Sequence, residues 1–264
     1  MRYLELPPSA ALAPYVRCVW IFEAEAPVAE PQRIVPDGRA ELIVHYRAAY
    51  AEGGEPQPGA VFAGQLTRPL WLRATGPSGV LGVRFHPAAA RCFAGMPMYR
   101  ANDRRIDLDA LWPGQGTKLA SDGRRADDDP SRAAIATGFV AQRIAAGPPL
   151  DDAVVRCCAL LESTHDDARV AALCALAGLG RRQLERRFRD AVGVGPALLA
   201  SILRLRTVFD LIERDSDRPW TDAALAAGYF DQSHFIRDFR RLVGCTPTEF
   251  LAATPGIAST LVAH

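Results

Sequence analysis

The feature that most constrains this chain is an internal repeat in its C-terminal half. A spacing of 51 residues relates three pairs of positions, which are Phe188 and Phe239, Gly193 and Gly244, and Pro196 and Pro247. Gly178 and Gly228 are 50 residues apart, so the second unit has one extra residue in its turn. Repetition at a fixed spacing predicts that one supersecondary unit occurs twice.

Each unit has the layout of a helix-turn-helix motif. An alanine-rich segment, 171–177 or 222–227, leads into a glycine at which we expect a sharp turn with positive φ. An amphipathic segment follows and ends at a second glycine. Apolar residues four positions apart predict one buried face in each unit, formed by Leu184 and Phe188 in the first and by Phe235 and Phe239 in the second.

A further helix is expected between the two units. Residues 196–214 place apolar side chains on one side, namely Leu199, Leu203, Val208 and Leu211. A helix of about 18 residues spans roughly 27 Å. Successive major-groove faces of B-DNA lie about 34 Å apart. This spacing suits one chain that meets two successive grooves of a duplex.

The overall charge does not indicate a nucleic-acid-binding protein. The net charge of the whole chain is +1, and residues 150–264 contain 14 arginines against 15 acidic residues. The local distribution differs, because residues 181–190 contain five arginines and two acids. Such a run is typical of a solvated helix face. Within a helix-turn-helix unit it indicates DNA binding instead, because guanidinium groups bind both phosphates and guanine edges.

Residues from about 150 to 252 resemble the C-terminal DNA-binding domain of AraC/XylS-type transcription regulators. The matching residues are Gly178-Leu179, Leu184, Phe188, Gly193, Arg204-Leu205-Arg206, Trp220-Thr221-Asp222, Gly228-Tyr229, Asp231-Gln232-Ser233-His234-Phe235, Arg237, Phe239-Arg240, Gly244, Thr246-Pro247 and Phe250. Two positions depart from the pattern of the family. Gly180 replaces the usual serine cap, so we expect a frayed start of the first recognition helix, and Phe230 replaces a common Ser or Ala.

The resemblance implies a sequence-specific, DNA-binding transcription regulator and assigns roles to individual residues. The residues expected to contact bases are Arg182, Glu185 and Arg186 in the first unit, and Gln232, Ser233, Ile236 and Arg237 in the second. The residues expected to contact phosphates are Arg181, Arg189, His234, Arg240 and Arg241. Two alternatives stay open: Glu185 could form a salt bridge to Arg181 or Arg189, and His234 could make a structural hydrogen bond.

The N-terminal half has a different residue pattern, which predicts a β-rich domain over residues 1–112. Short apolar runs rich in β-branched and aromatic residues alternate with Gly/Pro turns, which favours a sandwich or small barrel. We expect an exposed linker with one helix over 113–149, its segment 113–131 lacking apolar periodicity, and an all-α DNA-binding domain over 150–264. The fold class is therefore α+β with two domains.

Parts of the N-terminal half resemble a cupin-like domain of unknown function that precedes the DNA-binding module in some family members. The matching pieces are Arg33-Ile34-Val35-Pro36-Asp37-Gly38, Glu41-Leu42-Ile43, Gly82-Val83-Arg84-Phe85-His86-Pro87 and residues 108–112. The resemblance implies an effector-binding or dimerisation domain. The candidates for lining an effector pocket are Trp20, Phe22, Glu41, Tyr46, Phe62, Trp71, Arg84 and Phe85, which could equally be core residues, or in the case of Glu41 and Arg84 an ion pair.

Enzymatic alternatives find little support in the sequence. A cupin metal site would need more ligands than the isolated His45 and His86. An alkyl-accepting DNA-repair domain would need a zinc-activated thiolate, but the N-terminal half has only Cys18 and Cys92. We therefore expect no metal, no cofactor and no catalysis, and six free thiols in a reducing compartment.

The expected partner is double-stranded DNA, with RNA polymerase, a small-molecule effector and a second copy of the chain as further candidates. Neither a signal segment nor a run of about 18 apolar residues is visible, so a cytoplasmic protein without membrane contact is expected. The operator, the effector, the direction of regulation and the oligomeric state stay open.

Overall fold

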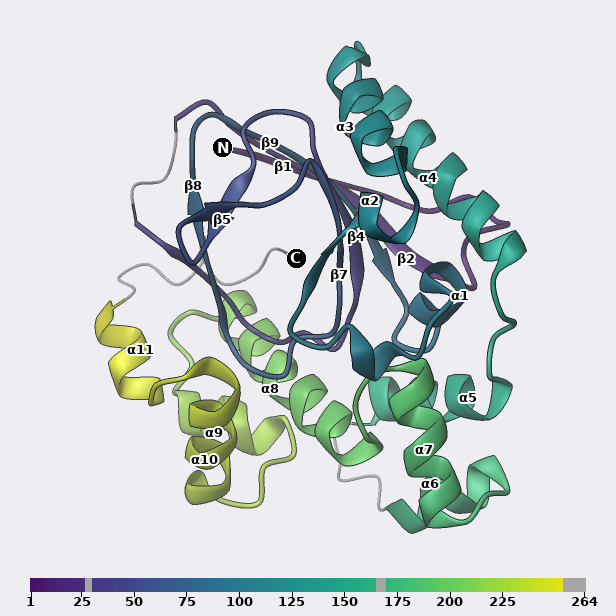
Figure 1. Ribbon diagram of the computed structural model, residues 1–264. Coiled ribbons are helices and arrows are strands. Elements are labelled where there is room, and N and C mark those ends of the chain that lie inside the picture. The colour runs from purple at the N-terminus through teal and green to yellow at the C-terminus, as the bar shows by residue number, and fades with distance from the viewer. Residues whose placement is uncertain (27–29, 165–169, 254–264) are drawn as a thin grey trace.

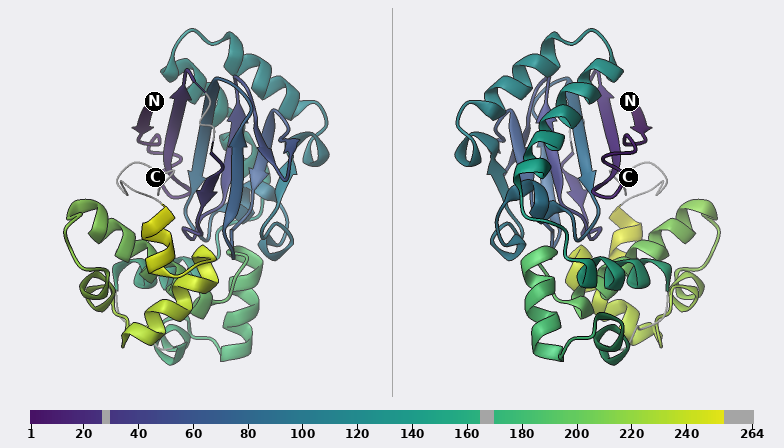
Figure 2. Two further views of the ribbon diagram at one scale, coloured as in Figure 1. Left: turned by 90° about the vertical axis from the view of Figure 1, so that its left-hand side faces the viewer. Right: turned by 90° about the vertical axis from the view of Figure 1, so that its right-hand side faces the viewer.

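The computed structural model describes residues 1–26, 30–164 and 170–253. Within these ranges, a β-rich N-terminal half stands on an all-helical C-terminal half (Figures 1 and 2). The expected α+β architecture with two domains is therefore confirmed.

Ten strands in the described residues form two antiparallel sheets. The six-stranded sheet has the order β1 (Arg2–Leu6), β2 (Val16–Ala24), β9 (Ser78–Phe85), β4 (Glu41–His45), β7 (Ala60–Ala63) and β10 (Arg105–Asp107). The four-stranded sheet has the order β3 (Gln32–Ile34), β8 (Leu70–Ala74), β5 (Tyr50–Glu52) and β6 (Glu55–Pro56). Strand β9 is buried along its whole length, as expected for a central strand covered on both faces.

Helices cover the face of the six-stranded sheet that points away from the smaller sheet (Figure 1). They are α1 (Ala90–Ala94), the 3-10 helix η1 (Met98–Arg100), α2 (Leu108–Leu111), α3 (Gln115–Arg125) and α4 (Asp129–Ala146). Aromatic rings from β7, β9, α1 and α4 meet in this core, among them Phe62, Phe85, Phe93 and Phe139.

The prediction of an exposed linker over residues 113–131 is wrong for most of this segment. Helix α3 occupies it, and Leu119 and Ala120 are buried against β4 and β7. Asp128 then caps α4 by accepting a hydrogen bond from the Ser131 amide. Only two apolar side chains of α3, Leu119 and Ala120, enter the core. Two such residues are too few to produce an apolar period that is visible in the sequence.

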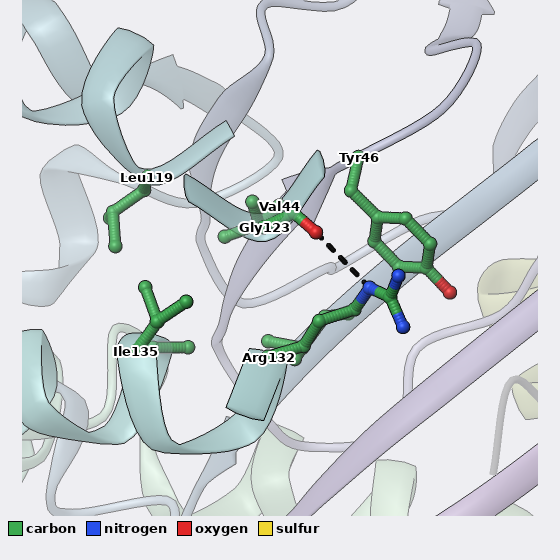
Figure 3. Close-up of a pocket in the computed structure, with 8 residues that line it drawn as sticks. Val44, Tyr46, Leu119, Gly123, Arg132 and Ile135 are labelled. Atoms are coloured by element: carbon green, nitrogen blue, oxygen red, sulfur yellow. Dashed lines mark hydrogen bonds between the residues drawn. The ribbon is translucent and has the colours of Figure 1, made fainter. Parts of the chain in front are cut away.

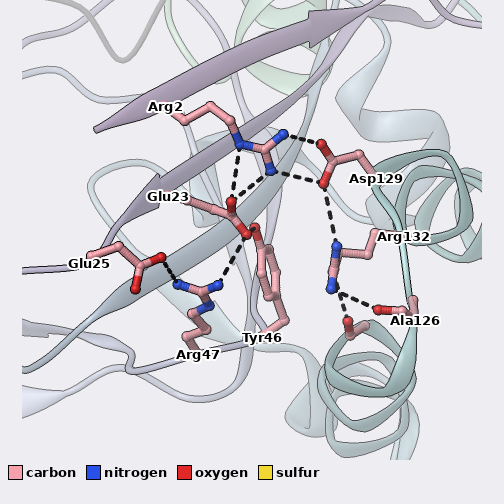
Figure 4. A network of polar contacts seen from close by, with 9 residues as sticks. Arg2, Glu23, Glu25, Tyr46, Arg47, Ala126, Asp129 and Arg132 are labelled. Atoms are coloured by element: carbon pink, nitrogen blue, oxygen red, sulfur yellow. Dashed lines mark hydrogen bonds and ion pairs between the residues drawn. The ribbon is translucent and has the colours of Figure 1, made fainter.

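A network of ion pairs fastens α4 to the edge of the sheet (Figure 4). The Arg2 guanidinium on β1 donates to Asp129 on α4 and to Glu23 on β2. Arg132 lies over the ring of Tyr46, 4.7 Å from its centroid, and donates to the Ala126 and Gly123 carbonyls at the end of α3. The contacts thus join four segments that are distant in sequence.

The C-terminal half consists of helices and two apolar cores. The helices are α5 (Asp152–Ser163), α6 (Val170–Ala177), α7 (Arg181–Ala191), α8 (Pro196–Arg214), α9 (Trp220–Ala226), α10 (Gln232–Val243) and α11 (Pro247–Ala253). The two helix-turn-helix units expected from the repeat are α6–α7 and α9–α10. Gly178 and Gly228 have φ of +66° and +87°, so the positive φ expected at both turns is confirmed.

All six cysteines are free, as expected. Cys18, Cys92, Cys157 and Cys158 are buried, and the remaining two are half-buried. Among the helices of the described ranges, none alone has the length and apolar character needed to cross a membrane; α7 and α8 meet that test only as a pair bent by 58°.

Two glycine substitutions should affect stability in opposite directions. A Cβ on Gly82 would lie 2.0 Å from the Trp20 indole, so Gly82→Ala should destabilise the β half by about 1–3 kcal/mol. Gly138 lies on the exposed side of α4 with no atom near its missing Cβ, so Gly138→Ala should stabilise the protein by about 0.5–1 kcal/mol. Thermal unfolding of both variants measures this, and equal midpoints would contradict the packing described here.

Candidate nucleic-acid interface

Helix α7 of the first unit presents one apolar face to the protein and one basic face to solvent. Leu184 and Phe188 are fully buried against α5, α6 and α8, as the spacing predicted. Arg181, Arg182 and Arg186 are exposed. No side chain caps this helix at Gly180, in agreement with the missing serine. The exposed arginines therefore begin directly at the N-terminal end of α7, where helix-turn-helix proteins contact base edges.

Glu185 behaves differently from its arginine neighbours. It is half-buried, and its carboxylate lies against Gly195, the residue that precedes α8. A Cβ on Gly195 would lie 2.4 Å from Glu185 Oε2, so only glycine leaves room for this approach. In the free protein Glu185 faces the start of α8 rather than the basic face.

Two arginines of α7 are engaged within the protein. Arg187 donates two hydrogen bonds to Asp151, at 2.6 and 2.7 Å, and Asp151 also caps α5 through the Val154 amide. Burial alone would raise the pKa of Asp151, but these hydrogen bonds outweigh it and lower the pKa. Arg189 stacks over the Tyr99 ring of the β half at 5.7 Å. The basic face of α7 is therefore narrower than the sequence suggested.

The second unit is built around an aromatic cluster. Trp220 at the start of α9 packs edge-on against Phe209, while Phe235 and Phe239 of α10 and Phe250 of α11 complete the cluster. Asp231 caps α10 by accepting a hydrogen bond from the His234 amide at 2.7 Å. The recognition helix of this unit thus has the side-chain cap that α7 lacks.

The solvent face of α10 gathers most of the residues expected to contact DNA. Gln232, Ser233 and Arg237 are exposed, as are Arg240 and Arg241, the latter 3.4 Å from Asp238. Ile236 is only half-exposed, because part of its side chain packs on the aromatic core.

His234 lies beside a small internal polar group rather than on the open face. Its ring packs edge-on against Tyr229, and its Nε2 lies 3.4 Å from Arg204 of α8 and 3.8 Å from Asp238. The structural hydrogen bond that was one of the alternatives for His234 matches this placement.

The eight candidates for an effector pocket do not come together. Phe62, Phe85 and Tyr46 face the helices, whereas Trp20 and Phe22 face the smaller sheet. Glu41 accepts hydrogen bonds from Arg84 at 2.6 Å and from Trp20 Nε1 at 3.1 Å, and Trp71 is 48% exposed on β8.

The polar pair Glu41–Arg84 is buried within the β half. Burial raises the pKa of Glu41 against the attraction of Arg84. Asp37 and Glu5 also lie within 4.0 Å of the guanidinium. The charges of Glu41 and Arg84 are therefore paired within the protein, and this ion pair connects β4 to β9.

A hollow between the sheet and helices α3 and α4 is nearly filled by side chains (Figure 3). It is lined by Tyr46, Leu119, Arg132 and Ile135, among others, and leaves about 10 Å³, roughly the space of one water molecule. It is too small for an organic effector.

The two candidate metal ligands are separate. His45 is buried on β4 with its Nε2 3.1 Å from Gln57 Oε1, and burial lowers its pKa to about 4. His86 is half-buried beyond the end of β9. Over residues 1–26, 30–164 and 170–253, no group of three or more His, Cys, Asp or Glu side chains is placed to hold a metal ion.

Comparison with family models agrees with this geometry. A model described as "Helix-turn-helix domain", of the AraC type, matches residues 173–253, which span both units and α8. The C-terminal half therefore contains an AraC-type helix-turn-helix domain. A second model, "Domain of unknown function (DUF6597)", matches residues 4–107 of the β half.

Curated relatives of this chain share only part of its length. A Mycobacterium tuberculosis protein named "Probable bifunctional transcriptional activator/DNA repair enzyme AlkA" is 37% identical over 102 residues, 38% of this chain and 20% of the relative. The Escherichia coli "RCS-specific HTH-type transcriptional activator RclR" is 32% identical over 91 residues, 34% of this chain and 32% of the relative. The matches therefore cover a third or less of these relatives.

The whole fold is similar to that of a solved structure. Vibrio cholerae ToxT superposes with a TM-score of 0.51 at 11% identity, covering 89% of this chain and 99% of ToxT. At this identity the likeness concerns the fold alone. It extends to both halves of the chain.

Two exposed apolar residues near α10 were not assigned a role from the sequence. Phe230, noted only as a departure, is 88% exposed in the turn before Asp231, and Leu225 on α9 is 58% exposed. The signal was present for Phe230, because an aromatic residue replaced a small one next to a recognition helix. For Leu225, the alanine-rich pattern of α9 suggested burial.

Neighbouring arginines on α7 provide a matched pair of variants. Arg187→Ala should lower the free energy of unfolding by about 1.5 kcal/mol, because it removes two hydrogen bonds from a carboxylate. Arg186→Ala should leave it within about 0.5 kcal/mol, since this side chain is exposed.

The destabilisation in Arg187→Ala should depend on pH. Asp151 has a depressed pKa in the folded protein, so its contribution is present above the ordinary Asp pKa of about 4 and is lost as pH falls through the folded value. Chemical unfolding of the wild type and of both variants at pH 7 and at pH 3 measures the destabilisation and its dependence on pH. A loss in Arg186→Ala as large as in Arg187→Ala would contradict the assignment.

Proposed function

We propose that this chain is a sequence-specific transcription regulator that binds two successive major-groove segments of double-stranded DNA. The observation that carries the proposal is the duplication of the recognition element. Two helix-turn-helix units with exposed Arg, Gln and Ser residues at the start of α7 and α10 flank a single rigid helix, α8.

The proposed division of labour follows from exposure and position. Arg182 and Arg186 on α7, and Gln232, Ser233 and Arg237 on α10, are exposed near the ends expected to enter the groove, and they suit direct contacts to base edges. Arg181, Arg240 and Arg241 suit phosphates. Glu185, Ile236, Arg189 and His234 have contacts within the free protein, so their proposed roles at DNA require those side chains to reorient.

The β half is proposed to regulate rather than to catalyse. Relatives that are named as transcriptional regulators support a regulatory role for the chain. A small-molecule effector, RNA polymerase and a second copy of the chain are proposed as further partners, acting in the cytoplasm.

A DNA-repair activity is the alternative to consider, because a relative carries it in its name. An alkyl-accepting thiol works as a thiolate. Burial raises the pKa of Cys18 to about 11 and also raises that of Cys92, which keeps both protonated at neutral pH. These thiols are therefore poor nucleophiles.

Selection of bound duplexes from a random library with the full chain tests the proposed function. The expected result is a site of two short conserved blocks whose centres lie about one helical turn apart, 10–10.5 base pairs. Recovery of duplexes without shared sequence would contradict specific recognition.

Arg186 and Arg241 should differ in what they contribute. Arg186→Ala should cost about 1–3 kcal/mol on the selected site and relax the preference at one base position. Arg241→Ala should weaken binding to all sequences alike and reduce the salt dependence by about one counterion. Binding isotherms on selected and random duplexes at several salt concentrations measure both. Equal losses on both duplexes for both variants would refute this division.

A further inference from the structure

A cleft lies between the β half and the helical half. Its volume is about 260 Å³, enough for a small molecule. Arg17 of β2 and Arg39 of the segment before β4 line it from the β half. Glu162 of α5 and Arg204, Arg206 and Asp210 of α8 line it from the helical half.

The charges in this cleft are not balanced by the described side chains. Arg17, Arg39 and Arg206 line it together with two carboxylates, a formal excess of one positive charge, while the fourth lining arginine, Arg204, is engaged with His234 and Tyr229. The carboxylates are already engaged, since Glu162 pairs with Arg39 at 2.9 Å and Asp210 lies 3.9 Å from Arg206. Like charges brought together in a partly desolvated space repel each other, which costs stability unless an anion joins them.

Arg39 bears most of this cost. Its side chain is only 5% exposed, and its Nε and Nη1 have no hydrogen-bond partner among the described residues. Burial lowers the pKa of Arg39, Glu162 and Asp37 oppose this shift, and the charges of Arg206 and Arg17 add to it. Because arginine does not deprotonate in proteins, the group stays charged and under-satisfied.

The lining also defines what could fill the cleft. The arginines supply the donors of the cleft, because the hydroxyls of Thr164 and Thr207 already donate to the Leu160 and Leu203 carbonyls. Guanidinium groups bind oxyanions through paired N–H donors. An apolar effector would leave these donors without partners and desolvated.

We propose that this cleft binds a small multivalent oxyanion, such as a phosphate monoester or a polycarboxylate, held by Arg17 and Arg39 from the β half and by Arg206 from α8. The bound anion joins the two halves, because its ligands come from both. Small reorientations of Arg39 bring its unsatisfied N–H groups to the anion.

The site differs from the pocket first considered inside the β half, where the candidate residues are dispersed. It also offers a direct connection to DNA binding, since α8 carries both recognition units. Any difference in anion affinity between the free and DNA-bound arrangements changes DNA affinity by the same factor. This consequence rests on the proposed function, whereas the binding of the anion does not.

Calorimetric titration of the full chain with inorganic phosphate and with citrate, without DNA and at constant ionic strength set by chloride, tests the proposal. The expected result is saturable binding near one anion per chain. Arg17→Gln and Arg206→Gln should each weaken it by about tenfold or more, or 1.4 kcal/mol. Arg156→Gln, an exposed arginine of α5 outside the cleft lining, is the matched control and should bind as the wild type does.

The exposed arginines of α7 could also attract phosphate, so Arg186→Ala provides a second control. Unchanged anion binding in Arg186→Ala together with a loss in Arg206→Gln supports the cleft. No saturable binding of either anion, or equal binding by the wild type and both cleft variants, overturns the proposal. Neither result depends on DNA, so failure here is distinguishable from failure of the selection experiment that tests the proposed function.

Discussion

Helix α8 must bury apolar side chains in two separate cores, and the geometry of the DNA-binding half depends on this requirement. Leu199 at its start belongs to the core of the first unit with Leu184 and Phe188. Residues from Ile202 to Ile212 belong to the core of the second unit. A helix of 19 residues is about 28 Å long and cannot shorten, so burial at both ends fixes the separation of α7 and α10. The spacing of the two proposed recognition helices therefore depends on the packing of one helix.

Ion pairing within the protein then determines which arginines stay available to a binding partner. The chain carries 31 basic Lys and Arg residues against 30 acidic ones, so a DNA-binding face cannot arise from bulk charge. Arg187 is neutralised by Asp151, and Arg204 is buried beside His234 and Tyr229. The arginines that remain exposed on α7 are Arg181, Arg182, Arg186 and Arg189, the last of them stacked on Tyr99. The interdomain cleft is the opposite case, because Arg17, Arg39 and Arg206 gather there with only Glu162 and Asp210 as carboxylates among the described lining residues.

The sequence predicted the helical half well because its signals are local. Gly178, Gly228 and the aromatic residues of α10 determine turns and buried faces within a few positions of themselves. Helix α3 was missed because only Leu119 and Ala120 enter the core, so tertiary packing rather than an apolar period stabilises it. In β9 every residue is buried, and alternation cannot then indicate which face a side chain occupies. The cleft was invisible for a similar reason, since its arginines come from positions 17, 39, 204 and 206 and meet only in the fold.

The contacts between the two halves are not evenly distributed over the helical half. Asn102 of the β half donates a hydrogen bond to the Gly193 carbonyl at 2.8 Å, just beyond the end of α7. Arg33 lies between the rings of Trp71 and Phe250, and its Nη1 lies 2.8 Å from Cys245 Sγ, just beyond the end of α10. Gly193 and Gly244 are equivalent positions of the repeat.

The β half therefore holds both units at the same place, the end opposite to the one expected to contact bases. Apolar residues of the β half also take part, since Ala88 belongs to the core of the first unit and Val35 packs against the core of the second. A shift of the β half would move the C-terminal ends of α7 and α10 while α8 keeps their spacing. The β half thus contacts the two units at equivalent positions, and through Tyr99 it also contacts Arg189, a residue proposed to bind phosphate.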